Sequence, residues 1–412
     1  MGGFGLLGQK LGHSYSPAIH KALGGYDYRL FEVKPDDLAG FLQREDFRGL
    51  NVTIPYKQAV MQYCAELTPV ARSIGSVNTI LRREDGSLLG HNTDASGFSA
   101  MINQSGTEIR GAKVLVLGSG GSSLSVRHVL RELGAGEIVT ISRSGEEHYG
   151  NLHRHADAQV LINTTPVGMY PQTDARPVDL AALPNLQAVL DIIYNPARTR
   201  LLMQASERGV PHMGGLVMLV GQARTACELF LGEEIPAARE REVTADLRRQ
   251  TENIVLVGMP GCGKTTIARQ LAHQMGRPLV DCDLAIEAAA GMSIPEIFRL
   301  EGEDGFRQRE AKILNEYGKR SGLVISTGGG CVARRENYFS LRQNGVVIFL
   351  EREISKLARK GRPLSQSGDL ARMHAERLPL YRQFADLTVQ NNASPDAVAK
   401  NILEAAYEFI GH

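Results

Sequence analysis

The sequence has little of what marks secreted or membrane-bound chains. It contains five cysteines in 412 residues, an odd and scattered set that does not form a disulfide framework. No window approaches the run of about 18 apolar residues that a membrane-spanning helix requires. Residues 1–10 lack a basic segment followed by a long apolar one, so we expect no export signal. These absences predict a soluble, cytoplasmic protein.

Neither sign of charge is in excess. The chain has 46 lysines and arginines against 45 aspartates and glutamates, a formal net charge of +1. This balance argues against nucleic acid and anionic membrane surfaces as partners. The hydrophobic share of 43% and the charged share of 22% are typical of a globular protein, and the length predicts two or three domains. Glycine is abundant at 44 residues, which predicts tight turns of the kind that phosphate binding needs.

Short apolar runs recur along the chain, each after a turn signal and before a helical pattern. This order is typical of α/β folds built on parallel sheets. Two different glycine-rich turns, at 118–123 and 258–265, lie far apart and predict two separate nucleotide-binding units. We expect the boundary near 248–252, at the end of a charged segment. The expected strands cover residues 113–117, 137–142, 159–163, 188–193, 253–257, 323–326 and 346–350.

A phosphate-binding loop opens the second half. Residues 258–265 (GMPGCGKT) match the pattern G-x-x-x-x-G-K-[ST] at every fixed position, between an expected strand and an expected helix. The glycines let backbone N–H groups surround phosphates, Lys264 reaches the terminal phosphates, and Thr265 can hold Mg²⁺. The loop therefore predicts a nucleoside triphosphate site, formed by Gly261, Cys262, Gly263, Lys264, Thr265 and Thr266.

Two aspartates and three arginines that follow the loop indicate which substrate could receive the phosphate. Asp281 and Asp283 follow a second short strand, where one can support magnesium and the other can accept a proton from a hydroxyl; an acidic helix cap is the alternative. Arg307 lies on a helical segment, and the triple glycine 328–330 ends a strand where a side chain would obstruct a ligand. Two more arginines follow, Arg362 in a lid-like GRPL segment and Arg377 in ERLPLY.

On these motifs, residues 253–412 resemble a shikimate kinase over that family's whole length. The resemblance implies that Asp283 contacts the hydroxyl that is phosphorylated and that Arg307 and Arg377 hold the shikimate carboxylate, a role that suits the planar guanidinium group. Gly329 would line the same pocket. It also implies the catalytic set Asp283, Lys264 and Arg362, the last as a lid arginine over the phosphates, and the metal set Thr265 and Asp281.

The first half contains a second glycine-rich turn. Residues 114–123 (VLVLGSGGSS) fit a strand that enters G-x-G-x-x-[GA], except that Ser123 replaces the third small residue. The next expected strand ends in Ser-Arg143-Ser, where an acidic residue would favour NAD. An arginine suits a ribose 2′-phosphate and favours NADP, although Glu146 and Glu147 follow and would repel it. The turn residues expected at the cofactor are Gly118, Ser119, Gly120, Gly121, Ser122 and Ser123.

Upstream, Lys57 and Asp94 predict a function only when they are considered as a pair. Lys57 ends the segment NVTIPYK and alone is typical of a surface lysine; Asp94 alone is typical of a helix cap. A lysine beside a carboxylate can supply and recover a proton at the oxygen of a carbonyl that is being reduced.

Residues 1–250 resemble a shikimate dehydrogenase over essentially that family's full length, through these segments, NTTPVGM at 163–169 and GLVMLVGQ at 215–222. The resemblance implies that Lys57 and Asp94 are the catalytic pair. It implies a substrate set of Ser14, Ser16, Thr53, Asn78, Asp94, Tyr194 and Gln222, and adds Arg143, Gly215 and Met218 to the cofactor set. In this chain the stretch 145–158 is short and lacks the basic residue that the family has after Arg143. We interpret His148, His153 and His155 there as a solvated loop rather than a metal site.

The two resemblances share one compound. They imply NADPH-dependent reduction of 3-dehydroshikimate to shikimate, followed by phosphorylation of shikimate with ATP and Mg²⁺. We expect an α/β protein, a monomer or homodimer, with a substrate domain at 1–100 to which 223–250 returns, a Rossmann-like NADP domain at 101–222, and a P-loop kinase domain at 253–412 with a parallel sheet. Two alternatives remain: a quinate/shikimate dehydrogenase that prefers NAD, or one half that binds ligand without turnover.

Overall fold

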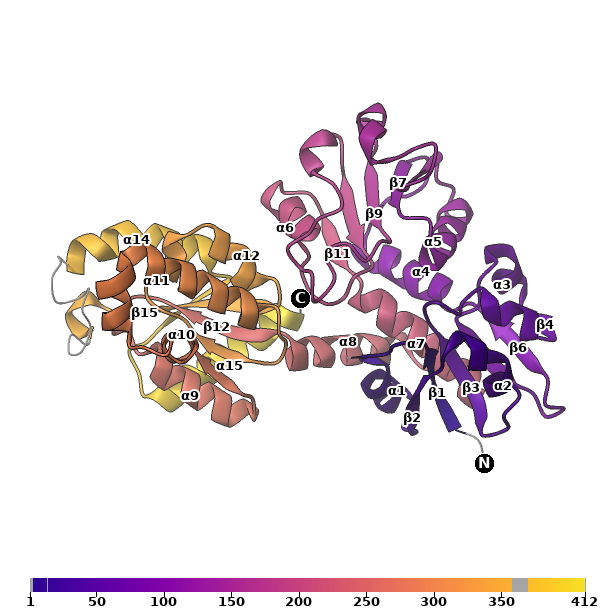
Figure 1. Cartoon of the computed structure of the whole chain (residues 1–412), viewed down its shortest axis with the longest axis horizontal. Coiled ribbons are helices and arrows are strands. Elements are labelled where there is room, and N and C mark those ends of the chain that lie inside the picture. Colours follow the sequence, from indigo (N-terminus) through magenta and orange to yellow (C-terminus); the bar gives the residue numbers. More distant parts are fainter. Residues whose placement is uncertain (1–2, 13, 358–369, 412) are drawn as a thin grey trace. The chain divides into compact units, whose positions relative to one another are not determined.

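The computed structural model describes residues 3–12, 14–357 and 370–411 (Figure 1). The chain divides into two compact units. The first contains Met1–Tyr194 and Thr199–Thr244, and the second contains Asn195–Arg198 and Ala245–His412. The division falls within helix α8 (Ala237–Thr251), a few residues before the expected boundary. Each unit is described by itself below.

The first unit contains two sheets. One is a six-stranded sheet in the order β2-β1-β3-β5-β6-β4, in which β3, β5 and β6 pair antiparallel and the other pairs are parallel. The other is a five-stranded parallel sheet in the order β11-β10-β9-β7-β8. The strands are β1 (Gly3–Gly8), β2 (Tyr28–Glu32), β3 (Phe47–Val52), β4 (Glu66–Leu67), β5 (Thr79–Arg82), β6 (Leu88–His91), β7 (Lys113–Leu117), β8 (Glu137–Ile141), β9 (Val160–Asn163), β10 (Ala188–Asp191) and β11 (His212–Gly214).

Two helices join the sheets of the first unit. Helix α4 (Asp94–Ser105) leads from the first sheet toward the second, and α7 (Leu216–Leu231) follows β11 and packs along α4. A Cβ at Gly97 would lie 2.4 Å from the carbonyl oxygen of Met218, so a glycine is needed for this close approach. The other helical segments are α1 (Ser16–Gly24), η1 (Pro35–Asp37), α2 (Leu38–Leu42), η2 (Ala59–Tyr63), α3 (Pro69–Ile74), α5 (Gly121–Glu132), η3 (Tyr149–His155), η4 (Leu180–Ala182) and α6 (Arg200–Glu207).

The second unit is built on one parallel sheet in the order β13-β14-β12-β15-β16. Its strands are β12 (Asn253–Val257), β13 (Leu279–Asp281), β14 (Val324–Ser326), β15 (Gly345–Glu351) and β16 (Leu387–Gln390). Helices α9 and α15 cover one face, and α11, α12 and α14 lie on the other (Figure 1). The helical segments are α9 (Lys264–Met275), α10 (Cys282–Ala290), α11 (Ile294–Gly318), η5 (Cys331–Ala333), α12 (Glu336–Arg342), η6 (Ile354–Lys356), α14 (Leu370–Phe384) and α15 (Pro395–Gly411).

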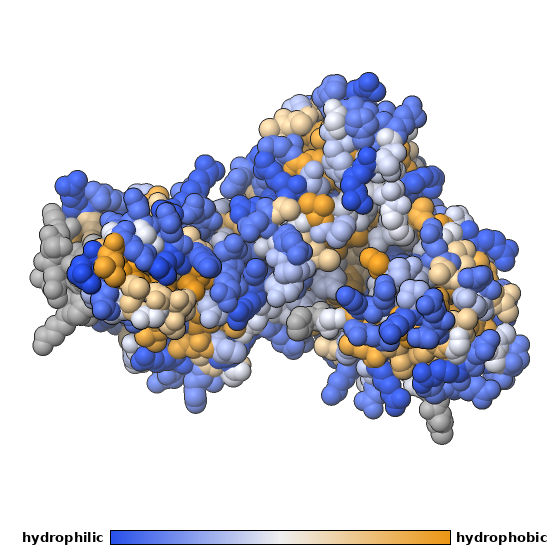
Figure 2. All heavy atoms as spheres, viewed as in Figure 1, coloured by the Kyte–Doolittle hydropathy of each residue, from blue (hydrophilic) through white to orange (hydrophobic). Residues whose placement is uncertain are grey.

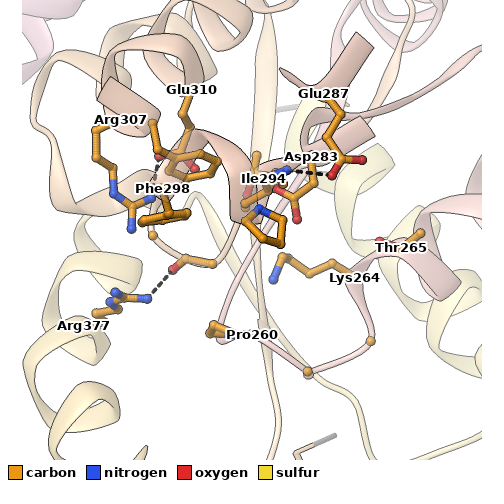
Figure 3. Close-up of a pocket in the computed structure, with 18 of the residues that line it drawn as sticks. Pro260, Lys264, Thr265, Asp283, Glu287, Ile294, Phe298, Arg307, Glu310 and Arg377 are labelled. Carbon is orange, nitrogen blue, oxygen red and sulfur yellow. Dashed lines mark hydrogen bonds and ion pairs between the residues drawn. The ribbon is translucent and has the colours of Figure 1, made fainter. Parts of the chain in front are cut away.

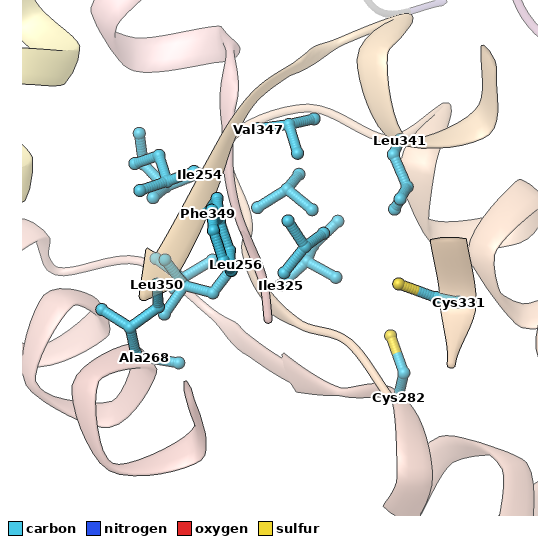
Figure 4. Packing of buried hydrophobic residues seen from close by; sticks show 14 of the residues in the cluster. Ile254, Leu256, Ala268, Cys282, Ile325, Cys331, Leu341, Val347, Phe349 and Leu350 are labelled. Atoms are coloured by element: carbon cyan, nitrogen blue, oxygen red, sulfur yellow. The ribbon is translucent and has the colours of Figure 1, made fainter. Parts of the chain in front are cut away.

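The core of the second unit explains the apolar runs of its strands. Both faces of the sheet are covered, so every residue of β12 is buried and the strand reads as a continuous apolar run. Figure 4 shows Ile254, Leu256 and Phe349 packed together, with the thiols of Cys282 and Cys331 at one side of the cluster. These two cysteines are small, fully buried side chains that pack as part of the core.

The surface carries no large apolar belt in the view of Figure 2, where hydrophilic residues cover most of the visible face and apolar residues occur in small groups. Ile54 (76% exposed), Leu284 and Leu300 are the most exposed large apolar side chains of the described residues. Within those residues, no helix combines the length and apolar character needed to cross a bilayer.

Two candidate active sites

The structure brings Lys57 and Asp94 together in the first unit. Lys57 lies shortly after β3, and Asp94 is the first residue of α4. The lysine Nζ donates a hydrogen bond to Asp94 Oδ2 at 2.6 Å, and the two side chains are only 14% and 9% exposed. The positive end of the α4 dipole also favours the carboxylate. This pair has the geometry of a protonated lysine held by a carboxylate.

A buried network fixes the orientation of the Asp94 carboxylate. Asn78 Nδ2 donates to Asp94 Oδ1 at 2.8 Å, and Asn78 Oδ1 accepts from the Thr93 backbone N–H at 2.7 Å. The hydroxyl of Thr79 donates to Asn78 Oδ1 at 3.1 Å and accepts from Asn51 Nδ2 at 3.0 Å. All five residues are buried. Because each polar group of Asn78 has a partner, its amide has one favoured orientation, and so has the carboxylate.

The network also reaches one more predicted substrate residue. Gln222 projects from α7, and its Oε1 accepts a hydrogen bond from the Thr93 hydroxyl at 3.3 Å. Ser14 and Ser16 lie where α1 begins, and the backbone N–H of Ser16 donates to Ser14 Oγ at 3.2 Å. Sequence reasoning assigned Gln222 but not Thr93, although Thr93 directly precedes Asp94.

Two further predicted substrate residues lie at strand ends. Thr53 directly follows β3, and its backbone N–H donates to Leu7 O at 2.9 Å. Tyr194 follows β10, where its ring centroid lies 5.4 Å from that of Tyr15, and burial raises the pKa of its hydroxyl. Tyr194 is therefore held as a neutral hydroxyl that can both donate and accept.

A cavity of about 790 Å³ adjoins Lys57. The glycine turn at the N-terminus of α5 forms one wall, where helical N–H groups favour an anionic ligand. Gly118 has φ +104°, and a Cβ there would lie 2.9 Å from Thr164 Oγ1, so a glycine is required. The lining residues are Ile54, Pro55, Lys57, Gln58, Gly118, Ser119, Gly120, Gly121, Ser122, Ser142, Arg143, Tyr149, Thr164, Thr165, Pro166, Val167, Arg176 and Pro177. A turn, a helix N-terminus and an arginine at the end of β8 fit a dinucleotide with a 2′-phosphate.

Three of the predicted cofactor residues are absent from this described lining. Ser123 is fully buried within α5, and Met218 is 7% exposed. A Cβ at Gly215 would lie 2.0 Å from Ile192 O, so close backbone packing explains this glycine. That Ser123, Gly215 and Met218 contact a cofactor stays a prediction. Burial and close packing already explain why residues of these kinds occur at these positions.

The interpretation of the histidine-rich stretch as a solvated loop is wrong for one residue. His155 is 7% exposed, and its Nε2 lies 3.0 Å from Glu147 Oε2, whereas His148 and His153 are exposed. The residues form the short helical segment η3, which brings His155 under the turn that follows β8. Among the described residues, no group of three or more His, Cys, Asp or Glu is placed to hold a metal ion.

The second unit contains a cavity of about 330 Å³ beside its glycine loop (Figure 3). Its lining includes the predicted Gly261, Gly263, Lys264, Thr265, Thr266, Asp283, Arg307, Gly329 and Arg377. The thiol of Cys262 is instead fully buried beneath the loop, so this residue can offer a ligand only its backbone. Arg362 lies outside the described residues, and the prediction of a lid arginine is therefore not tested.

Thr265 and Asp281 form the side-chain pair expected for a metal. The Thr265 hydroxyl donates to Asp281 Oδ2 at 2.9 Å, while Asp281 Oδ1 accepts from the backbone N–H groups of Asp283 and Leu284 and caps α10. Asp281 thus combines both predicted roles, a helix cap and a carboxylate beside the phosphate loop. A hydroxyl and a carboxylate next to phosphate oxygens fit Mg²⁺, which keeps few protein ligands.

Two arginines converge on the triple glycine. Arg307 Nη1 donates to Glu310 Oε2 at 2.7 Å, and Arg377 Nη1 donates to Gly329 O at 3.2 Å. A Cβ at Gly330 would lie 2.2 Å from Arg307 Nη2, and one at Gly328 would lie 2.6 Å from Glu310 Oε1. The glycines therefore leave room for the charged side chains that line the cavity.

Glu310 is a site residue that sequence reasoning missed. Its carboxylate is fully buried, and burial raises its pKa. Oε1 has no hydrogen-bond partner among the described residues, although the carboxylate lines the cavity. The one available signal was its position three residues after Arg307, which places both on the same face of a helix.

The comparisons with known proteins agree with this geometry. Residues 6–80 match the model of the shikimate dehydrogenase substrate binding domain, and residues 260–407 match that of shikimate kinase. The shikimate dehydrogenase (NADP(+)) of Clostridium perfringens is 38% identical over 266 residues, which cover 60% of this chain and 98% of the relative. The chain belongs to the shikimate dehydrogenase family.

Two solved structures align with the same part of the chain. The shikimate 5-dehydrogenase of Thermus thermophilus, in complex with NADP(H) and shikimate, is 32% identical with a TM-score of 0.54, covering 60% of this chain and 99% of that one. Quinate dehydrogenase from Corynebacterium glutamicum, in complex with NAD, is 29% identical with a TM-score of 0.54, covering 59% and 98%. The family covers the first unit, and the second unit contains a shikimate kinase domain.

Proposed function

We propose that this chain is a bifunctional enzyme that reduces 3-dehydroshikimate to shikimate with NADPH and then phosphorylates shikimate with ATP. The observation that carries the proposal is that each unit has its own site with reacting groups and a place for a nucleotide: Lys57 and Asp94 beside a dinucleotide cavity, and Asp283 beside a phosphate loop. One compound would leave the first site as product and enter the second as substrate.

In the reductase site, Lys57 donates a proton to the oxygen of the carbonyl that is reduced. NADPH, when bound, supplies the hydride for the carbonyl carbon. Asp94, held by Asn78, keeps the ammonium group in place and balances its charge. Gln222 and Tyr194 would bind the hydroxyl groups of the ring, and Ser14 and Ser16 its carboxylate. The buried position of the pair limits competing proton exchange with water.

In the kinase site, Arg307 and Arg377 would hold the shikimate carboxylate, and Asp283 would accept the proton of the attacking hydroxyl. ATP, when bound with Mg²⁺, supplies the phosphoryl group. Lys264 and the loop N–H groups would balance the phosphate charge, with Thr265 and Asp281 on the metal side.

A coupled assay tests the proposal. Purified protein is given 3-dehydroshikimate, NADPH, ATP and Mg²⁺, and the oxidation of NADPH and the appearance of shikimate 3-phosphate are followed together. Omission of ATP should stop the reaction at shikimate. Omission of NADPH should prevent formation of both shikimate and shikimate 3-phosphate, and addition of shikimate should then restore only shikimate 3-phosphate. Protein that binds shikimate but turns over neither reaction would overturn the proposal.

The same assay decides the cofactor. It is repeated with NADH in place of NADPH, and the first unit is also assayed with quinate and NAD. These two measurements test the alternative that the first unit is a quinate/shikimate dehydrogenase. The arginine at the end of β8 favours NADPH, and a large preference for NAD with quinate would refute that assignment.

A further inference from the structure

The turn after β8 presents an electrostatic conflict. Arg143 lines the dinucleotide cavity together with Ser142 and Tyr149. Glu146 and Glu147 follow within four residues, and no lysine or arginine occurs between Arg143 and Arg154. Arg143 and Glu146 are exposed and Glu147 is half-buried, so a carboxylate that moved next to Arg143 would pair with the guanidinium or repel a phosphate there.

The backbone of this turn is anchored at two places. The Ser142 N–H donates to Glu147 O at 3.2 Å, and the Asn151 side chain accepts from the His148 N–H and donates to Glu146 O. These bonds fix the path of the chain between β8 and η3. The position of the Glu147 side chain is then decided by its own partner.

That partner is His155. Glu147 Oε2 lies 3.0 Å from His155 Nε2, the imidazole is 9% exposed, and the carboxylate is 30% exposed. Glu147 is not among the described residues that line the cavity. The hydrogen bond from His155 is the largest of the causes that lower the pKa of Glu147, so the carboxylate is retained there as an anion. The histidine therefore holds in place a negative charge that follows Arg143 by four residues along the chain.

We propose that His155 is a positioning residue that determines specificity for the 2′-phosphate of NADP(H), because it binds Glu147 and keeps that carboxylate away from Arg143. The inference rests on the proposed function, which places the 2′-phosphate at Arg143. It assigns a role to the short histidine-containing stretch 145–158.

Binding of two fragments of the cofactor isolates the effect. Adenosine 2′,5′-bisphosphate carries the 2′-phosphate and 5′-AMP does not, so calorimetric Kd values for both need no turnover. His155→Ala should weaken the bisphosphate about fivefold to tenfold, the scale of one poorly screened charge pair, and leave 5′-AMP unchanged. The KM for NADPH should rise by the same factor, with the KM for NADH and kcat unchanged. His153→Ala, an exposed histidine two residues earlier, is the matched control.

Removing the charge should reverse the loss. The double variant His155→Ala/Glu147→Gln should bind the bisphosphate within about twofold of the wild type, and His155→Gln, which keeps a donor, should be intermediate. The proposal is overturned if the double variant stays as weak as His155→Ala, because the histidine then supports only the fold of the loop. It is also overturned if His155→Ala changes nothing, or if Glu147→Gln alone weakens the bisphosphate. An Arg143→Ala variant that still prefers the bisphosphate would instead refute the placement of the 2′-phosphate, which is part of the proposed function.

Discussion

A single methyl group at the triple glycine of the second unit should separate shikimate binding from ATP binding. The Cβ of Gly330→Ala would lie between 2.2 and 2.4 Å from three atoms of the Arg307 guanidinium. Gly330 has φ −102°, a conformation that alanine adopts without strain. The Arg307 side chain is 6% exposed and bound to Glu310, so the methyl group must displace it from the cavity.

The size of the effect follows from the contact that is lost. Hydrogen bonds to a charged group contribute about 1.5–3 kcal/mol, and each 1.4 kcal/mol is about a factor of ten. The KM for shikimate should therefore rise about 10-fold to 100-fold, with the KM for ATP within about twofold of the wild type. The reductase activity of the same preparation serves as an internal standard for folding and concentration.

Steady-state kinetics of the kinase with varied shikimate measures the change. Gly411→Ala is the matched control, because a Cβ there meets no atom closer than 3.9 Å and Gly411 lies in α15, outside the cavity lining. A KM for shikimate that shifts less than about twofold would refute the reasoning, since it would mean that Arg307 does not bind the substrate from its position beside Gly330.

The remaining predictions concern separate features of the two units. Lys57→Ala should abolish the reductase and leave the kinase at its wild-type rate, whereas Lys264→Ala should do the converse; loss of both activities in either variant, seen in parallel assays, would contradict separate sites. Thr79→Val removes the hydroxyl that orients Asn78 and should lower the reductase kcat about tenfold with little change in KM. Thr79→Ser keeps the hydroxyl and should retain the rate. Equal kinetics of the two variants would show that this hydrogen bond does not support catalysis. Burial lowers the pKa of His20 to about 3 from an ordinary 6.5, so neutral His20 stabilises the fold fully above pH 6.5 and this contribution is lost as the pH falls toward 3. Between about pH 7.5 and pH 5 the loss is about 2 kcal/mol of the free energy of unfolding, and His20→Gln should flatten this slope in urea titrations.

Local sequence patterns were sufficient to predict those parts of the fold that consist of one buried strand and the turn that follows it. Strands β7 and β12 begin and end at the predicted residues, and the parallel α/β architecture is confirmed. The reason is physical: a strand buried on both faces has to be apolar throughout, and a phosphate loop needs glycines at fixed spacings.

Tertiary contacts between distant segments were not predictable in the same way. Asn51, Thr79 and Thr93 are small polar residues whose importance arises only when three strand and helix ends meet around Asn78. The pairing of His155 with Glu147 likewise depends on how the turn after β8 folds back, which composition does not encode. Burial of charged groups is invisible in a single sequence because it is a property of the surrounding elements.

The pairing of α4 with α7 has a consequence for catalysis. Asp94 starts one of these helices and Gln222 lies on the other, and the contact at Gly97 presses their backbones together between the two sheets. A rotation displaces atoms in proportion to their distance from its axis. If the two sheets of the first unit rotate apart to admit a nucleotide, the residues at the contact between α4 and α7 move least. Asp94 lies at this contact, so it keeps its orientation when the site opens and closes.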